Sequence, residues 1–93
     1  MRSDTINRKD GQKQPPRNQD WQERSQALSA RIGGRIHELR RERGLSLDAV
    51  GGAELTRSYM SLVEHGRTRI SLQSLMIVAE RLGVSIVSLI EDN

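Results

Sequence analysis

Four hydroxyl residues, each followed by a short apolar stretch, constrain most strongly what this chain can fold into. Ser and Thr favour the N-cap of a helix, because the side-chain oxygen accepts a hydrogen bond from a free backbone N–H of the first turn. Apolar side chains at helical spacing follow Ser46, Thr56, Ser71 and Ser85. Glycine commonly ends a helix in a left-handed conformation, and Gly66 and Gly83 stand at suitable positions. The pattern predicts short helices that begin after these residues.

A longer helix is predicted ahead of them, capped by Ser25 or Ser29 and ending at Gly44. One face of it carries apolar residues at helical spacing, namely Leu28, Ile32, Ile36 and Leu39. The pair Gly33-Gly34 weakens this helix without abolishing it. On the helix after Ser71 we expect an inward apolar face made of Leu72, Leu75, Met76, Val78, Ala79 and Leu82. No segment alternates as a half-buried strand does, so we predict an all-α fold of five helices.

The chain is long enough for one domain with a tail. Residues 1–24 are polar, contain Pro15-Pro16, and offer only Ile6 and Trp21 as apolar residues after Met1. Such a segment cannot bury enough apolar surface to offset the entropy of ordering. We predict a disordered or partly ordered tail at 1–24 and a folded domain at 25–93. Trp21 either anchors on the domain or a partner, or begins the first helix.

Composition argues against several classes of protein. The chain has no cysteine, which excludes disulfides and thiolate metal sites. It has no apolar run approaching the ~20 residues of a membrane span, and no signal peptide at its start. His37 and His65 lack a partner at metal-ligand spacing, and no phosphate-binding glycine loop occurs. We expect a cytoplasmic protein that is not an enzyme and has no catalytic residue, metal or cofactor.

Charge is unevenly distributed along the chain. Residues 28–69 carry a net charge of +3, whereas residues 70–93 carry −2. This division suits a polyanion on one face of the molecule and a different contact on the other. Ordinary surface charge is the alternative explanation.

The segment 57–65 carries a possible DNA-reading face. On a helical wheel Met60 and Val63 share one side, and the other side presents Arg57, Ser58, Ser61 and Leu62. Arginine can bond guanine through its fork, serine can bond either base type, and an apolar side chain can touch a thymine methyl. A short helix, a turn and this helix make a helix-turn-helix. A solvated amphipathic helix remains the alternative.

Three segments in the same order, "IGGRIHELRRERGLS", "TRSYMSLVEHGR" and "SLQSLMIVAERLGVSIVSLI", carry a family resemblance. From Ile32 to Ile90 the chain resembles the Cro/phage-repressor type of helix-turn-helix domain, the XRE family. The resemblance implies a five-helix, lambda-repressor-like DNA-binding domain in a transcriptional regulator, with double-stranded DNA as partner and a place on the nucleoid.

The resemblance also implies roles for single residues. Base edges would be contacted by Arg57, Ser58, Ser61 and Leu62. Phosphates would be held by Ser46, Leu47, Thr56, Tyr59, Arg67, Thr68 and Arg69. A structural ion pair would join the first helix to the end of the recognition helix through Arg40 and Glu64.

Three departures from the family pattern affect the docking of this helix. Leu47 stands where the family often has glutamine, so one side-chain phosphate contact is missing. The chain from Ser46 to Glu64 is one residue shorter than usual, with Gly51-Gly52 in the turn. Ile70 replaces the usual proline.

Apolar residues near the C-terminus predict a homodimer. Ile77 and Val87 occupy positions that are usually polar in the family, and Ile90 lies one turn beyond Ile86. Exposed apolar patches mark contact surfaces, so we expect a two-fold dimer whose recognition helices lie ~34 Å apart on a pseudo-palindromic site. The alternative is that these residues enlarge a thin core.

Other functions of the same fold stay open. The chain could be an antitoxin or an adaptor to RNA polymerase that acts mainly through protein contacts. It could also be a controller protein of a restriction–modification system, or a regulator from a phage or mobile element. A pure adaptor has no need of Arg57, Arg67 and Arg69 around an exposed helix start, so we expect a sequence-specific regulator.

Overall fold

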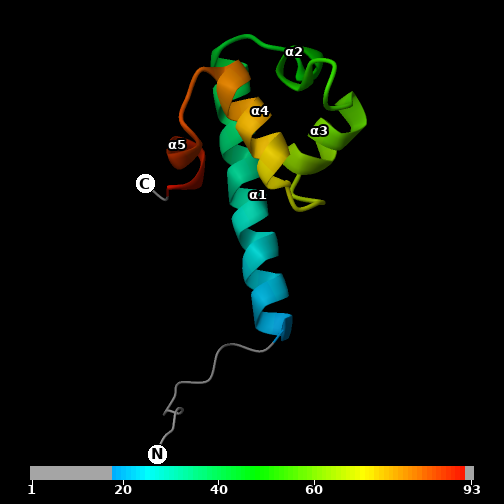
Figure 1. The fold of residues 1–93 in the computed structure, drawn as a ribbon, viewed down its shortest axis with the longest axis vertical. Helices are drawn as coiled ribbons and strands as arrows, with labels where there is room; N and C mark the ends of the chain where they lie inside the picture. The colour runs from blue at the N-terminus through cyan, green and yellow to red at the C-terminus, as the bar shows by residue number, and fades with distance from the viewer. Residues whose placement is uncertain (1–17, 92–93) are drawn as a thin grey trace, which may run out of the picture.

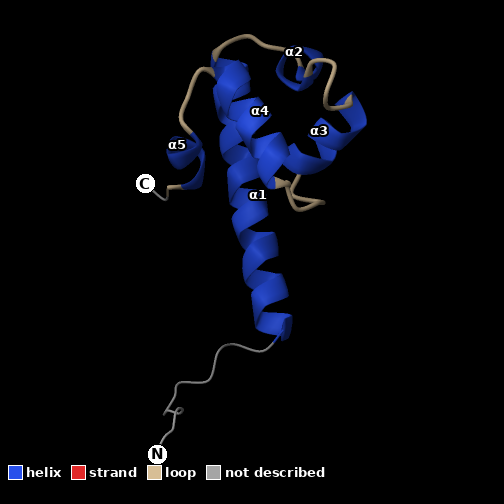
Figure 2. Ribbon diagram, in the orientation of Figure 1, coloured by secondary structure: helices blue, strands red, loops and turns tan. Residues whose placement is uncertain are grey.

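The computed structural model describes residues 18–91, and in this part of the chain the secondary structure is helices joined by loops, with no strand (Figure 2). The helices are α1 (Asn18–Glu42), α2 (Leu47–Gly51), α3 (Arg57–Glu64), α4 (Leu72–Leu82) and α5 (Ile86–Ile90). The predicted all-α fold of five helices is therefore confirmed. The predicted tail falls largely outside the described residues, and a domain start at residue 25 stays a prediction.

The short helices begin where the hydroxyl residues predict. Side-chain oxygens of Ser46, Thr56, Ser71 and Ser85 accept hydrogen bonds of 3.0–3.1 Å from backbone N–H groups in the first turn. Gly66 and Gly83 have φ angles of 70° and 74°, in the left-handed region that glycine tolerates. These local interactions set the helix boundaries before any packing is considered.

α1 begins at Asn18, earlier than the Ser25 start expected from the apolar spacing and close to Trp21, the other predicted start, which lies in the first turns of α1. No proline follows Pro16, Asp20 lies in the first turn where acids are favoured, and the Arg24 guanidinium lies 4.9 Å from the centre of the Trp21 ring. The N-terminal part of α1 extends beyond the other helices as a shaft (Figure 1). Leu28, expected on the core face, is consequently exposed.

The core forms where α3, α4 and α5 pack around the C-terminal half of α1 (Figure 1). α2 packs on α3 and α4. The buried apolar side chains are Ile32, Ile36, Leu39, Val50, Met60, Val63, Leu75, Val78, Ala79, Leu82 and Leu89.

The expected inward face of α4 is wrong at two positions. Leu72 and Met76 are 69% and 54% exposed. Leu75, Val78, Ala79 and Leu82 fill the face that meets the core, and a helix turns the intervening positions away from it. The helical spacing of the apolar residues is confirmed, but the predicted inward face is wider than the face that α4 buries.

Gly33 marks the place where α1 passes closest to α3. A Cβ atom at residue 33 would lie 1.9 Å from the carbonyl oxygen of Val63, a distance that no side chain can occupy. The residue that weakens α1 by propensity therefore permits the backbone of α3 to pack against it.

Arg81 of α4 holds the shortened turn between α2 and α3. Its Nη1 donates to the Val50 carbonyl at 3.1 Å, and its Nη2 donates to Glu54 at 2.6 Å. Gly52 has a φ of 60°, and a Cβ there would lie 2.1 Å from Nη1 of Arg81. The backbone conformation favours glycine at residue 52, and a side chain there would also displace the guanidinium of Arg81 from its hydrogen bonds.

Replacing Gly33 with alanine should lower the free energy of unfolding by roughly 2 kcal/mol, because the new methyl forces α3 away from α1. Gly34 is the matched control, since a Cβ there meets nothing within 4 Å. Gly34→Ala should raise stability by up to about 1 kcal/mol through helix propensity. Urea titration followed by circular dichroism measures both; equal effects of the two changes would contradict the close approach.

Candidate nucleic-acid interface

The outward face of α3 is set by the residues that the helix buries on its opposite side. Met60 and Val63 have no exposed surface and fix α3 on the core. Arg57 and Ser58 at its start are exposed, Leu62 is 44% exposed, and Ser61 is half-buried. The structure thus brings the four residues predicted to face bases onto the outer side of one helix. α2, the turn and α3 together have the order of a helix-turn-helix.

The loop after α3 places two arginines beside this helix. Arg67 and Arg69 are exposed, and Thr68 between them is half-buried. Arg69 Nε donates to the hydroxyl of Ser25 at 2.9 Å, and Gln26 Nε2 donates to the Gly66 carbonyl at 2.7 Å. The N-terminal half of α1 therefore anchors the arginine loop. Sequence reasoning missed this anchor, because the contacting residues are about forty positions apart and share no motif.

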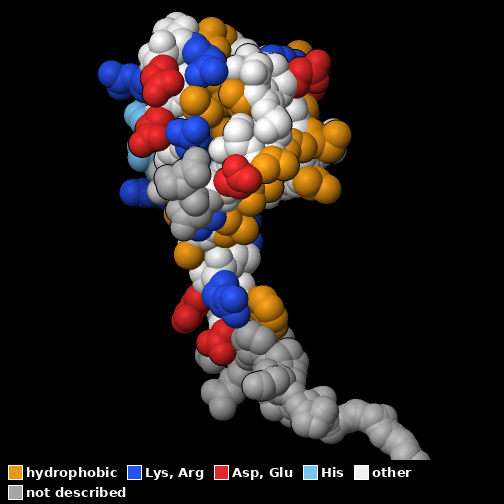
Figure 3. Space-filling model, turned by 90° about the vertical axis from the view of Figure 1, so that its left-hand side faces the viewer, with side chains coloured by type: hydrophobic (Ala, Val, Ile, Leu, Met, Phe, Trp, Pro, Cys, Tyr) orange, Lys and Arg blue, Asp and Glu red, His pale blue; other side chains and the backbone are white. Residues whose placement is uncertain are grey.

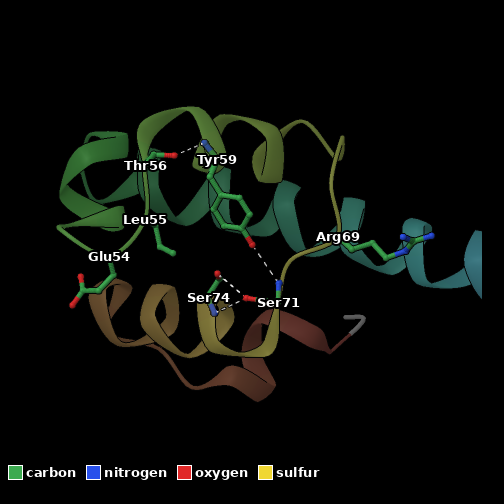
Figure 4. Close-up of a pocket in the computed structure, with 7 residues that line it drawn as sticks. All are labelled: Glu54, Leu55, Thr56, Tyr59, Arg69, Ser71 and Ser74. Carbon is green, nitrogen blue, oxygen red and sulfur yellow. Dashed lines mark hydrogen bonds between the residues drawn. The ribbon is translucent and has the colours of Figure 1, made fainter.

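A groove between the starts of α3 and α4 adjoins the same loop (Figure 4). Thr56 and Tyr59 lie on its α3 side, and Ser71 and Ser74 on its α4 side. The Tyr59 hydroxyl accepts a hydrogen bond of 3.3 Å from the backbone N–H of Ser71. Since that bond uses the oxygen as acceptor, the hydroxyl proton can still donate to a phosphate oxygen. Thr56 Oγ1 is used as the N-cap of α3.

The start of α2 offers less to a phosphate than the loop does. The Ser46 hydroxyl accepts the capping bond from Ala49 N–H. Leu47 is half-buried and packs against the core. The side chain of Leu47 therefore contributes to packing and offers no polar group to a phosphate, unlike the glutamine that the family often has at this position.

A charged cluster joins α1 to the end of α3. Arg40 donates to Glu64 from Nε at 2.7 Å and from Nη2 at 3.0 Å, and its Nη1 donates to the Leu45 carbonyl at 2.9 Å. His37 Nδ1 lies 2.8 Å from the Glu64 carboxylate, whose side chain is only 4% exposed. The structure brings the proposed pair of Arg40 and Glu64 into direct contact, and adds His37, which the sequence did not indicate.

The surroundings of Glu64 act on its pKa in opposite directions. Burial of the carboxylate raises its pKa. The hydrogen bonds with Arg40 and His37 together lower it by more than burial raises it, so the pKa of Glu64 lies below its ordinary value. The hydrogen bond with Glu64 raises the pKa of Arg40. Both groups are charged at neutral pH, and the pair orients the end of α3.

The residues expected to form a dimer interface differ in exposure. Val87 is 57% exposed, Ile77 is half-buried, and Ile90 is half-buried against the core. Arg31 and Arg35 of α1 donate to the carbonyls of Ile90 and Ser88, at 2.9 and 3.5 Å, and so hold α5 on α1. Seen from the side of α5, hydrophobic side chains gather on one side of the part of the molecule where the five helices pack together (Figure 3). Leu72 and Met76 add to the exposed apolar surface of α4.

The described residues lack two other kinds of feature, a membrane-spanning helix and a metal-binding cluster. No helix within residues 18–91 is long and apolar enough to cross a membrane. The same residues contain no group of three or more histidines and acids that could hold a metal ion.

An outward helix fixed by a buried face, preceded by a short helix and a turn, defines the class of helix-turn-helix proteins. A family model described as helix-turn-helix matches residues 36–89. The chain belongs to this family, in its XRE type, and its matched curated relative is a transcriptional regulator.

A single related protein supports the same family assignment. The HTH-type transcriptional regulator DdrOP3 of Deinococcus deserti is 43% identical over 58 residues, which cover 61% of this chain and 45% of that protein. The chain thus spans less than half the length of this relative.

Solved structures of two regulators resemble the fold. The restriction-modification controller protein C.AhdI of Aeromonas hydrophila matches with a TM-score of 0.63 and 33% identity, over 68% of this chain and 97% of that chain. The clp gene regulator ClgR of Corynebacterium glutamicum matches with a TM-score of 0.62 and 27% identity, over 67% of this chain and 82% of that chain.

Glu64→Gln should lower the free energy of unfolding by roughly 3 kcal/mol at pH 7, because Arg40 then lacks its anion in a mostly buried place. The folded-state pKa of Glu64 is depressed, so its stabilisation is complete above the ordinary value of 4.5 and is lost as pH falls through the lower folded value. Urea titrations of both proteins should therefore converge in acid.

The double variant Arg40→Met/Glu64→Leu is the control for this measurement. It should be less destabilised than Glu64→Gln, because no unpaired charge remains. A gap between wild type and Glu64→Gln that persists at pH 2 would contradict the assigned role of the ionised carboxylate.

Proposed function

We propose that this chain is a sequence-specific DNA-binding transcriptional regulator that recognises a pseudo-palindromic operator as a dimer. The observation that supports this most strongly is the geometry of α3. Met60 and Val63 fix its inner side in the core, while Arg57, Ser58 and Leu62 point outward beside a loop with two exposed arginines. Binding to the operator would place the protein on the nucleoid in the cytoplasm.

In the proposed complex α3 lies in the major groove with its N-terminal residues toward base edges. Arg57 bonds the O6 and N7 atoms of a guanine, Ser58 and Ser61 bond neighbouring bases, and Leu62 contacts a thymine methyl. Arg67 and Arg69 neutralise phosphates and set the register of the helix without reading sequence. Tyr59 and the start of α2 approach the same backbone.

The dimer is proposed to form through α5 and the adjoining edge of α4. Val87 is exposed on α5, and Met76 and Leu72 are exposed on α4, so water contacts apolar surface there until a second copy covers it. Ile77 and Ile90 extend this surface toward the core. The net charge of −2 in residues 70–93 favours a position of this end away from DNA.

A second candidate function is control of a restriction–modification system. It is favoured by the likeness to C.AhdI, of which this fold covers 97%. Genomic footprinting with the purified chain distinguishes the two candidates. A controller's footprint lies beside restriction–modification genes, and a general regulator's footprints lie at other promoters.

Arg57→Ala should weaken binding to the cognate duplex by ~1–3 kcal/mol and loosen preference at one base pair, because a bidentate guanine contact is lost. Arg67→Ala is the comparison: it should weaken all duplexes alike and flatten the salt dependence by about one unit. Fluorescence anisotropy with cognate and random duplexes at several salt concentrations measures both effects. An equal loss on both duplexes for Arg57→Ala would refute its role in reading bases.

Val87→Asp should convert the dimer to monomers, because two carboxylates would be buried against apolar surface at the two-fold interface. Ala27→Asp adds the same charge on the exposed side of α1 and should leave the dimer intact. Sedimentation velocity reports the mass of each variant. A Val87→Asp protein that still sediments as a dimer would remove α5 from the interface.

A further inference from the structure

Arg57, the residue with the greatest proposed role in base reading, is held by an acid in the DNA-free structure. Its Nη2 lies 2.5 Å from Oδ2 of Asp48, and its Nε lies 3.3 Å from Oδ1. Asp48 belongs to the first turn of α2, and Arg57 is the first residue of α3. The pair therefore bridges the two helices of the helix-turn-helix at the end that meets DNA.

The bond geometry leaves a defined part of the guanidinium for a base. A guanidinium has five N–H donors, on Nε, Nη1 and Nη2. Asp48 uses the edge formed by Nε and Nη2. The edge formed by Nη1 and Nη2 keeps two parallel donors, which is the arrangement that guanine O6 and N7 accept.

The same contact opposes binding of Arg57 to phosphates. A free arginine on this face would swing to whichever phosphate lies nearest, on any sequence. The carboxylate neutralises the arginine locally and repels the phosphates, while a base edge carries no such charge. The hydrogen bond from Arg57 lowers the pKa of Asp48, so the carboxylate is ionised at neutral pH.

The pair is not placed to stabilise the fold. The side chains of Arg57 and Asp48 are 69% and 59% exposed, and exposed pairs contribute little to stability. In contrast, the buried Arg40 pair orients α3, and Arg81 with Glu54 fastens the turn to α4. An exposed bidentate pair on the proposed DNA face has its effect on what Arg57 can bind.

We propose that Asp48 is a specificity-determining residue that orients Arg57 toward a base edge and withholds it from phosphates. It contacts no DNA itself and acts through the arginine. This inference rests on the proposed function, since it assumes that α3 reads a duplex. The inference adds a role for Asp48 of α2: this acid increases the difference between the affinities for cognate and random duplexes.

The test compares Asp48→Asn with wild type on a selected cognate duplex and on a random duplex of equal length. Asp48→Asn should tighten random binding about threefold or more and steepen its salt dependence by about one unit, because one more cation is free for phosphates. Cognate binding should stay unchanged or weaken, so the ratio of the two affinities should fall about threefold or more. The thermal midpoint should stay unchanged.

Glu54→Gln is the matched control. It removes the same charge from the neighbouring turn, but its partner is Arg81 on α4 and not a residue of α3. The affinity ratio should therefore stay at the wild-type value. In an Arg57→Ala background, Asp48→Asn should no longer change the ratio, because the arginine through which it acts is gone.

The outcomes separate this inference from the proposed function. If Asp48→Asn changes cognate and random affinities by the same factor, or if Glu54→Gln lowers the ratio equally, Asp48 acts only as general charge and the inference is overturned while operator recognition stands. A wild-type protein with no preference among duplexes would overturn the proposed function and the inference together.

Discussion

The contact between Arg40 and Glu64 fixes the direction of the helix on which the rest of the site depends. Arg40 bonds the carboxylate through two nitrogens and uses the third for the Leu45 carbonyl, so one guanidinium joins α1, the end of α3 and the chain that leads to α2. Gly33 allows the backbones of α1 and α3 to touch just beyond this pair. A buried charge pair adds little net stability over apolar packing, but its geometry is specific. Its main effect here is to orient α3.

Arginines in this chain have two separate tasks that a count of charges does not distinguish. Arg31, Arg35 and Arg81 donate to backbone carbonyls and hold short helices on longer ones. α2 and α5 are each five residues long, too short to be stable alone, so tertiary contacts of this kind must supply their stability. The arginines at residues 57, 67 and 69 lie exposed around α3 and are the ones proposed to meet DNA. Two of the three have partners in the structure: Arg57 bonds Asp48, and Arg69 bonds the hydroxyl of Ser25.

Much of the fold could be predicted from local chemistry. The caps at Ser46, Thr56, Ser71 and Ser85 gave the starts of four helices, because capping depends on neighbours within one turn. The inner side of α3 at Met60 and Val63 followed from helical spacing. The start expected at Ser25 lies later than the observed start of α1 at Asn18, because the shaft lacks the apolar stripe that packing requires. Leu72 and Met76 were assigned to the core because spacing gives a face but not its width.

The sequence by itself determined the number and order of the helices, their caps, the outward residues of α3 and the family, since each depends on residues within a few turns or on a motif. Apart from the pair of Arg40 and Glu64, which the family resemblance implies, only the tertiary structure decided which arginine meets which acid. The link between Asp48 and Arg57, the anchor of Arg69 on Ser25, and the need for glycine at residues 33 and 52 arise where separate helices meet. Such contacts depend on distances of a few ångströms between helices, and those distances are set by the packing of the whole core.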